Sequence, residues 1–424
     1  MSERRVHPAW VVLGALTLCI VAASGIRAAF GIYIKPLERE FGWSRGALSG
    51  AAAMSLLLLG AAGPFLGRLA DRWGAQRVIA ACLVLLGAGA LATAYVQSLW
   101  QIYVTMGLMM AIGAGGLAMT TAASIIARWF EARRGLAFGI AGAAMSAGQL
   151  LIIPLATGLT LAYGWRTSYL WLGALVLVVA LPVALAFIHN EPEERGLRPY
   201  GATGATQTSA QIAAEHRANR VSVFEAARVP QFWLLMGTFF VCGYTSAGMI
   251  LTHFVPHALD HNFTEIQAAT ALGVMGSMNI VGTIGSGWLC DRLGRRGPLA
   301  FYYFFRGLSL IFLLYVWNVP SLHFWAALFG LNFISTVPPT TTLTANIFGR
   351  YSVGELSGWI FFGHQVGSAL GAAVAGWMFE WTGSYSPAFV SAAVLAFVAT
   401  GLTLAIREEP VQTRPLAPAP ALAG

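Results

Sequence analysis

Two arginines lie inside long apolar stretches of the chain, where a charged side chain is costly. Arg27 falls within 10–33 and Arg306 within 299–317, while every acidic residue falls in a loop, a linker, a tail or the end of an apolar stretch. A charge at bilayer depth costs at least ~3 kcal/mol on insertion scales unless it is paired or hydrated. A guanidinium can hold a carboxylate through two parallel hydrogen bonds. We therefore interpret Arg27 as an anion anchor that faces a cavity, with the bound anion as its counter-ion.

The second arginine leaves two interpretations open. Arg306 lies eight residues after Pro298, near the predicted cytoplasmic end of its stretch. Its long side chain could therefore line the cavity or snorkel to the lipid headgroups.

Uncharged polar residues within the apolar stretches are further candidates for the lining of a binding site. His364 lies among glycine, alanine and aromatic residues, and its titratable imidazole makes it the default proton carrier. A lone histidine in a membrane is nevertheless more often a partner in a hydrogen bond between helices. The other candidates are Tyr33, Gln149, His253, Asn279, Asn332 and Thr340.

A short motif, Gly-x-Leu-x-Asp-Arg-x-Gly, occurs twice between apolar stretches. It begins at Gly67 and again at Gly287, and the same spacing of 220 residues relates Asp71 to Asp291. This spacing holds without a gap from Pro36, which corresponds to Pro256, to the pair of threonines at 120–121. The chain therefore consists of two copies of one unit.

The acids of the two motifs are predicted gating residues. We expect Asp71 and Asp291 to lie at cytoplasmic helix ends, where helix N-termini and arginines form clamps that exist in one conformation only. The arginines assigned to this gating set are Arg72, Arg133, Arg134 and Arg292.

The composition predicts that these residues sit in a polytopic membrane protein. Hydrophobic residues make up 57% of the 424, charged residues make up 10%, and the mean hydropathy is +0.68. Soluble domains carry about 25% charged residues. The apolar stretches are long enough to cross a bilayer as helices. They lie at 10–33, 45–69, 76–96, 98–127, 136–162, 167–189, 230–259, 266–290, 299–317, 320–347, 355–380 and 385–406.

We therefore predict an all-α membrane protein with twelve transmembrane helices in two pseudo-symmetric six-helix bundles. The first bundle spans 1–189 and the second 230–406, with a polar linker at 190–229 and a tail at 407–424. Proline interrupts the hydrogen bonding of a helix, so we expect such an interruption in helix 5 at Pro154 and in helix 10 at Pro338 and Pro339. In transporters, such breaks commonly border a site or a hinge.

The basic residues predict the orientation of the chain. With both termini inside, nineteen arginines fall in cytoplasmic segments, and only Lys35, Arg39, Arg45 and Arg166 fall outside. We expect a multi-pass protein of the plasma (inner) membrane with both termini in the cytoplasm, and separately a bacterial source and a monomer. The formal charge of +8 is a topology signal and does not indicate nucleic acid. The four cysteines show no paired spacing, so we expect no disulfide, metal or cofactor.

The duplicated motif resembles the loops between helices 2 and 3 and between helices 8 and 9 of the major facilitator superfamily. The stretch 129–148, WFEARRGLAFGIAGAAMSAG, resembles the helix 4–5 signature of its monocarboxylate transporters and the related oxalate–formate group. The aromatic pair, the two arginines, Leu-Ala-x-Gly and the last glycine all fall in register. The resemblance covers nearly the whole chain.

This resemblance implies alternating access between two bundles and a central anion site lined by helices 1, 4, 5, 7, 8, 10 and 11. Arg27 lies near the basic residue that monocarboxylate transporters carry in helix 1. Those transporters usually have an aspartate and an arginine in helix 8, where this chain has Asn279 and Thr283. The proton-linked ion pair is therefore absent, which puts proton symport in doubt, although a proton or a counter-anion stays a possible co-substrate.

Three classes of function remain at this point. The first is transport of a small organic anion, and the second is efflux of a drug-like or amphipathic compound by a transporter of the same superfamily. The third is a membrane enzyme or receptor, which the sequence does not favour because it contains no Ser/His/Asp set, metal cluster or nucleotide-binding loop. The lack of an intramembrane acid and the presence of Arg27 count against a cationic substrate.

Overall fold

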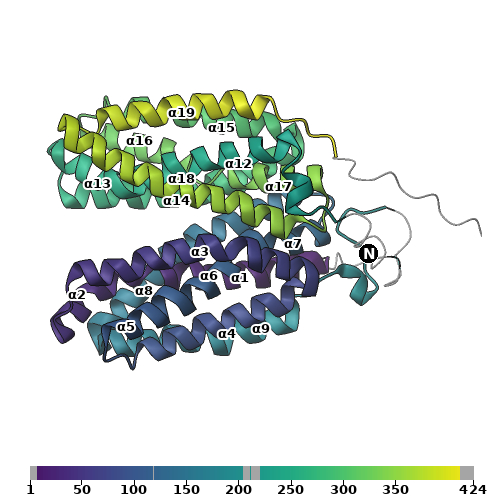
Figure 1. Cartoon of the computed structure of the whole chain (residues 1–424), viewed down its shortest axis with the longest axis horizontal. Helices are drawn as coiled ribbons and strands as arrows, with labels where there is room; N and C mark the ends of the chain where they lie inside the picture. The colour runs from purple at the N-terminus through teal and green to yellow at the C-terminus, as the bar shows by residue number, and fades with distance from the viewer. Residues whose placement is uncertain (1–6, 118, 204–210, 212–219, 411–424) are drawn as a thin grey trace, which may run out of the picture.

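The computed structural model describes residues 7–117, 119–203, 211 and 220–410, and these residues are almost entirely helical. Figure 1 shows two bundles that lie side by side, one from each half of the chain. Their helices form twelve membrane-spanning segments in the described part of the chain. Eight continuous helical runs there are long and apolar enough to cross a membrane, and one of these, from 134 to 187, contains two spans.

The helices of the two bundles follow the predicted order. The first bundle consists of α1 (Pro8–Ala28), α2 (Phe30–Phe41), α3 (Arg45–Trp73), α4 (Ala75–Thr93), α5 (Leu99–Ile102), η1 (Tyr103–Met110), α6 (Ala111–Gly116), α7 (Met119–Trp129), α8 (Arg134–Ala174), η2 (Leu175–Ala180) and α9 (Leu181–Phe187). The second consists of α12 (Pro230–Gly243), η4 (Tyr244–Ile250), α13 (Leu251–Asp260), α14 (Glu265–Leu293), α15 (Arg296–Leu313), α16 (Val319–Asn332), α17 (Val337–Phe348), α18 (Val353–Thr382) and α19 (Ser386–Leu404). The described part of the segment between the bundles includes the short helices η3 (Pro192–Arg195) and α11 (Val223–Ala226).

Helix α8 contains the fifth span and the start of the sixth, which continues through η2 and α9, and a single glycine turns the chain between the two spans. Gly164 has φ +84° and ψ 163°, a backbone conformation that residues with a Cβ rarely adopt. The break in hydrogen bonding expected at Pro154 does not end the helix, since α8 runs through this proline without a non-helical residue. One missing hydrogen bond is not enough to interrupt a helix that is packed along its length.

The tenth span is broken, as the sequence predicts. Helix α16 ends at Asn332, and α17 begins at Val337, followed by Pro338 and Pro339. Proline fits the first turn of a helix because its missing N–H would have no helical partner there. The two prolines therefore start a second half-helix, and the carbonyl groups at the end of α16 need other donors.

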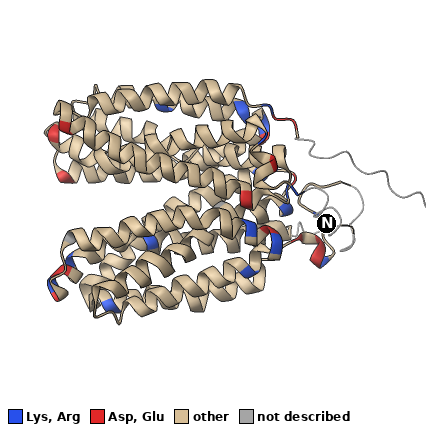
Figure 2. Ribbon diagram, in the orientation of Figure 1, with Lys and Arg blue, Asp and Glu red and all other residues tan. Residues whose placement is uncertain are grey.

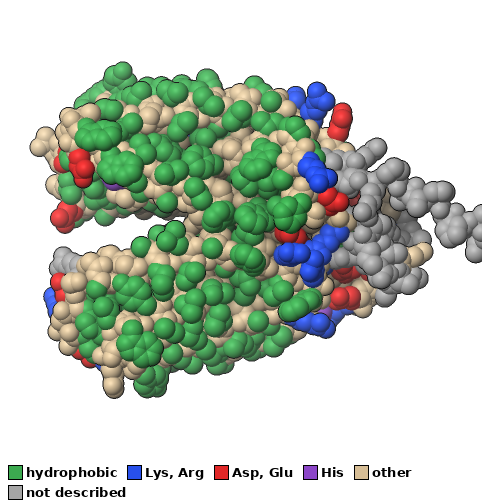
Figure 3. Space-filling model, viewed as in Figure 1, with side chains coloured by type: hydrophobic (Ala, Val, Ile, Leu, Met, Phe, Trp, Pro, Cys, Tyr) green, Lys and Arg blue, Asp and Glu red, His purple; other side chains and the backbone are tan. Residues whose placement is uncertain are grey.

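The two ends of the molecule differ. Figure 2 shows that charged residues gather at both ends and are sparse between them. Figure 3 shows a cleft that enters between the bundles at one end, which we call the open end. At the other end, where α3 finishes at Trp73 and α19 finishes at Leu404, the bundles touch, and we call this the closed end.

Glycines allow the bundles to approach to backbone contact at the closed end. A Cβ added to Gly67 of α3 would collide with the carbonyl oxygen of Gly354 of α18. A Cβ added to Gly287 of α14 would collide with the carbonyl oxygen of Gly135 of α8. Small residues at such crossings let membrane helices approach closely. The contacts of α3 with α18 and of α8 with α14 are therefore two copies of one packing arrangement.

Candidate functional site

A cavity of about 310 Å³ lies in the first bundle, and Arg27 forms part of its wall. Arg27 is half-buried and makes no hydrogen bond or ion pair with another residue in the described part of the chain. A guanidinium without a partner at this depth is stable only if water or a ligand reaches it. The lining comes from α1, α2, α3 and η1: Arg27, Ala28, Phe30, Gly31, Ile34, Ala51, Ala52, Ser55, Leu56, Met106 and Met110.

The packing of α1 explains why Arg27 faces this cavity. A Cβ at Gly25 would meet Ile152 and the carbonyl oxygen of Gly148, so this face of α1 lies directly against α8. Successive residues of a helix are rotated by about 100°, so Arg27 lies nearly opposite Gly25. The side chain is therefore directed away from α8, toward the cavity between α1, α3 and η1.

Gln149 and His364 are half-buried but do not line this cavity. Gln149 makes no hydrogen bond with a described residue. The Nδ1 atom of His364 pairs with Oε1 of Gln365 at 3.1 Å, and its ring lies 4.8 Å from that of Phe239. Gln365 in turn packs against the position of Gly60, so His364 lies next to a contact between the bundles.

Five other predicted lining residues have their polar atoms bound inside the protein in this conformation. The Tyr33 hydroxyl pairs with Ser168 at 2.9 Å, and His253 Nε2 lies 2.9 Å from the carbonyl oxygen of Ala372. Thr340 donates to the carbonyl of Thr336, the residue that precedes its own helix. The remaining two are Asn279 and Asn332. None of these five residues lines the Arg27 cavity.

Both asparagines support the broken tenth span. Asn279 Oδ1 accepts the N–H of Ile334 at 2.9 Å, and its Nδ2 donates to Ser146 of the other bundle. Asn332 Nδ2 donates to the carbonyl of Leu328 at 3.1 Å. Their role in this conformation is therefore to satisfy the backbone and neighbouring side chains around the break.

In this conformation Arg306 lies in neither of the two predicted surroundings. Its side chain is fully buried in the second bundle, so it neither lines the cavity nor reaches the headgroups. Its guanidinium donates to the carbonyl oxygens of Asn332 and Phe333, to Asn332 Oδ1 at 3.2 Å and to Thr245 Oγ1 at 3.3 Å. Arg306 thus caps the end of α16, where a positive charge also suits the helix dipole.

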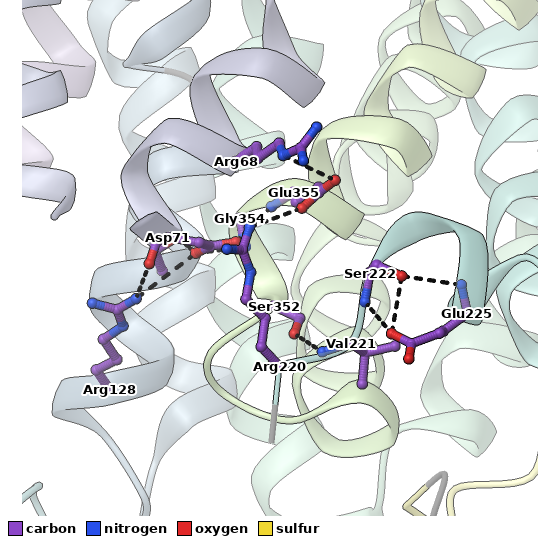
Figure 4. A network of polar contacts seen from close by, with 11 residues as sticks. Arg68, Asp71, Arg128, Arg220, Val221, Ser222, Glu225, Ser352, Gly354 and Glu355 are labelled. Atoms are coloured by element: carbon purple, nitrogen blue, oxygen red, sulfur yellow. Dashed lines mark hydrogen bonds and ion pairs between the residues drawn. The ribbon is translucent and has the colours of Figure 1, made fainter. Parts of the chain in front are cut away.

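The two motif aspartates bind helix N-termini of the opposite bundle. Asp71 accepts the backbone N–H groups of Gly354 at 3.3 Å and Glu355 at 2.8 Å, both in the first turn of α18 (Figure 4). Asp291 accepts those of Gly135 and Leu136, each at 2.8 Å, in the first turn of α8. These N–H groups have no partner within their own helices. Each carboxylate therefore caps a helix that belongs to the other half of the protein.

We call the contacts of Asp71 with the start of α18, and those of Asp291 with the start of α8, the Asp71 and Asp291 clamps. Further charges surround the Asp71 clamp, as Figure 4 shows. Ser124 donates to Asp71 at 2.6 Å, and Arg128 lies 3.9 Å from it. Arg128 also lies 3.5 Å from Glu191. Burial raises the pKa of the Glu191 carboxyl, while Arg128 opposes this shift. Arg128 is therefore shared between two carboxylates.

The side chain of Glu355 joins three parts of the chain at the closed end (Figure 4). It lies 3.9 Å from Arg68 of the first bundle and 3.1 Å from Arg220 of the segment between the bundles. No sequence motif marks Glu355, Arg68 and Arg220 as a group. A usable signal was an acid at the start of a predicted membrane helix, but its partners lie far away in the sequence.

The predicted gating arginines differ in their contacts. Arg134 is a bridge between the bundles, since it donates to Asn346 Oδ1 of α17 at 3.2 Å as well as to the carbonyl of Phe130. Arg72, Arg133 and Arg292 are exposed, and Arg292 lies over the ring of Trp288 in its own helix. Ser55, Met106 and Met110 of the cavity could not be predicted, because an apolar or small residue in a membrane helix carries no distinguishing signal.

Comparisons with known proteins agree with this architecture. The family model of the Major Facilitator Superfamily matches residues 16–363 and 286–423. An uncharacterized MFS-type transporter, YcxA, of Bacillus subtilis (strain 168) is 27% identical over 385 residues, covering 89% of this chain and 90% of that protein. Monocarboxylate transporter 11 of Mus musculus is 26% identical over 396 residues, covering 90% and 83%.

Solved structures share the fold at low sequence identity. The human organic anion transporter MFSD10 (TETRAN) superposes with a TM-score of 0.71 at 16% identity, covering 94% of this chain and 100% of that one. The proton:xylose symporter XylE bound to 6-bromo-6-deoxy-D-glucose gives a TM-score of 0.71 at 14% identity, covering 95% and 97%. With a family model that matches most of its length and the two-bundle fold, the chain belongs to the Major Facilitator Superfamily.

Proposed function

We propose that this protein transports a small organic anion of the monocarboxylate type across the membrane by alternating access, with Arg27 as the carboxylate anchor. The observation that carries this proposal is the half-buried guanidinium of Arg27, which lines a cavity and has no partner in the described part of the chain. A carboxylate would supply two hydrogen bonds in the plane of the guanidinium. The similarity to monocarboxylate transporters supports the same substrate class.

The closed end is the cytoplasmic end in this proposal. The positive-inside bias of nineteen arginines against four basic residues supports this orientation. The conformation is then outward-open, with the cleft of Figure 3 accessible from outside and both aspartate clamps formed inside. Transport requires that the clamps break and that the open end closes over the bound anion.

Uptake by the reconstituted protein tests this proposal. Labelled isovalerate and lactate serve as probes in proteoliposomes, with the wild type, Arg27→Lys and Arg27→Gln compared at equal insertion. We expect carboxylate uptake to fall at least about tenfold in Arg27→Lys, because the point charge of lysine cannot reproduce the paired hydrogen bonds. Uptake by Arg27→Gln should be lost completely. Near-normal carboxylate uptake by Arg27→Gln would refute the assignment of the anchor.

His364 is our proposed proton carrier if transport is coupled to protons. It is half-buried beside the contact between the bundles, and the eighth span, α14, has Asn279 and Thr283 in place of an ion pair. His364→Gln should then remove accumulation driven by a pH gradient while exchange of labelled for unlabelled anion continues. If no pH gradient drives transport by the wild type, the protein is a uniporter or an exchanger, and His364 has no role in coupling.

A further inference from the structure

We propose, on the basis of the proposed function, that the Arg27 cavity selects anions with a single carboxylate and an apolar body. Arg27 and Ser55 are the only lining residues with polar side chains. The remainder of the wall is built from alanine, glycine and apolar side chains that include Phe30, Ile34 and Leu56. The cavity thus offers one place for charge and a larger surface for carbon.

A second carboxylate would have no cationic partner in this cavity. No lining residue other than Arg27 carries a positive charge, so the second group would be dehydrated against apolar side chains. A hydroxyl group on the body of the ligand would face the same surface and lose a hydrogen bond to water. A volume of 310 Å³ equals about ten water molecules at ~30 Å³ each, which suits a carboxylate with a body of several carbons.

Ser55 is the second polar contact that we assign to the carboxylate. It lies on α3, is half-buried, and makes no hydrogen bond with a described residue. Its hydroxyl can therefore donate to the carboxylate beside Arg27. On the apolar side, the hydroxyl of Tyr169 donates to Met106 Sδ at 3.4 Å, which fixes this side chain in the wall.

Competition against bound labelled isovalerate tests the selectivity on the full-length protein in detergent or nanodiscs. Lactate, which is similar in size but hydroxylated, should compete roughly tenfold less well, and the dicarboxylate succinate should compete less well than lactate. Succinate or lactate competing as well as isovalerate would overturn the selectivity while leaving anion transport intact. Failure of all three anions to bind would instead overturn the proposed function.

A pair of matched variants checks that the wall itself sets the preference. Leu56 is half exposed in the cavity wall, so a change there should not disturb the fold. Leu56→Gln should reduce the preference for isovalerate over lactate severalfold, whereas Leu56→Met should keep it. Ser55→Ala should weaken the binding of all carboxylates by roughly tenfold without altering the order of their affinities. An unchanged preference in Leu56→Gln, or unchanged affinity in Ser55→Ala, contradicts the proposal.

A separate observation concerns the segment between the bundles, and from it we infer that Arg220 stabilises the closed end. Arg220 lies 3.1 Å from Glu355, and the next residue, Val221, is buried and donates its N–H to Ser352 Oγ at 2.7 Å. The segment is therefore held against the start of α18. Glu355 itself is nearly buried, with 6% of its side chain exposed.

Closing this end brings two carboxylates from opposite bundles together. The N–H of Glu355 donates to Asp71, so the two acidic residues meet only when the clamp forms. Arg220 and Arg68 offset the repulsion through their contacts with Glu355. The Asp291 clamp needs no such arginine, because Leu136 occupies the place that Glu355 has in the first turn of α18. Arg220 is thus a positioning residue that acts on one clamp of the pair.

Spin labels can report the opening of the closed end directly. Trp73→Cys and Leu293→Cys place labels at exposed positions at the ends of α3 and α14, and the native cysteines are buried. Arg220→Gln should raise the population with a longer distance between labels at least threefold, and Arg228→Gln, an exposed control in the same segment, should not. Adding Glu355→Gln to Arg220→Gln should restore much of the closed population, because it removes the repulsion. An unchanged distribution in Arg220→Gln, an equal shift in the control, or no rescue would overturn this inference.

Discussion

At the scale of single residues, the two intramembrane arginines have opposite surroundings. Arg27 lines a cavity without a partner, whereas Arg306 has four hydrogen-bond acceptors and no exposure. The sequence shows that the positive charge of both side chains needs compensation, but it cannot show which groups provide it. The carbonyls that bind Arg306 are exposed by the break in the tenth span, and only the packing of α15 against α16 brings them within reach.

Substitution of each arginine should therefore affect a different property. Arg306→Met leaves the carbonyl oxygens of Asn332 and Phe333 without donors, at a cost of about 1–3 kcal/mol each. We expect its thermal unfolding temperature to fall by several degrees, while Arg27→Gln should unfold at or above the wild-type temperature. Thermal unfolding of the purified variants in one detergent measures both. An Arg306→Met protein as stable as the wild type would contradict the capping role.

At the scale of helices, the paired glycines decide which helices cross between the bundles. The spacing of small residues predicts tight packing in general, but it does not name the partner of each helix. The structure pairs Gly67 with Gly354 and Gly135 with Gly287. Gly135, Gly139 and Gly148 of α8 also correspond to Gly354, Gly358 and Gly367 of α18 at a spacing of 219 residues, one less than in the motifs.

A single methyl group should prevent full closure of this end. A Cβ at Gly67 would overlap backbone atoms of α18, which cannot move aside as a flexible side chain can. Gly67→Ala should therefore shift the labels at 73 and 293 toward longer distances and slow transport. Gly14→Ala is the control, because nothing lies within 4 Å of its added Cβ and alanine favours a helix. A wild-type distance distribution in Gly67→Ala would show that the glycine contact does not limit closure.

At the scale of the whole molecule, the repeat and the apolar stretches predicted the fold well. Twelve spans in two bundles are present, and most boundaries lie within a few residues of those predicted. Around Pro154 the helix α8 continues, because packing along its length can maintain a helix through a proline. The polar residues were harder to assign, because a buried asparagine such as Asn279 has the same sequence signal whether it binds substrate or a neighbouring backbone. The sequence also does not predict which end of the molecule is closed, because this depends on contacts between helices that are distant in the sequence.

The free charge of Arg27 further predicts how the whole transport cycle behaves. In the described part of the chain every acid lies near a helix end or outside the helices, so no carboxylate neutralises Arg27 when the cavity closes. Closing the empty carrier would dehydrate a lone guanidinium at a cost of at least ~3 kcal/mol, whereas a bound carboxylate removes this charge. Exchange of anion for anion should therefore be at least about tenfold faster than net movement, since each ~1.4 kcal/mol is a factor of ten. Efflux of labelled isovalerate from proteoliposomes, with and without unlabelled isovalerate outside, measures the ratio. The His364→Gln variant should keep the stimulation of efflux by external anion. Equal efflux rates with and without external isovalerate would mean that the empty carrier returns with the charge of Arg27 already compensated.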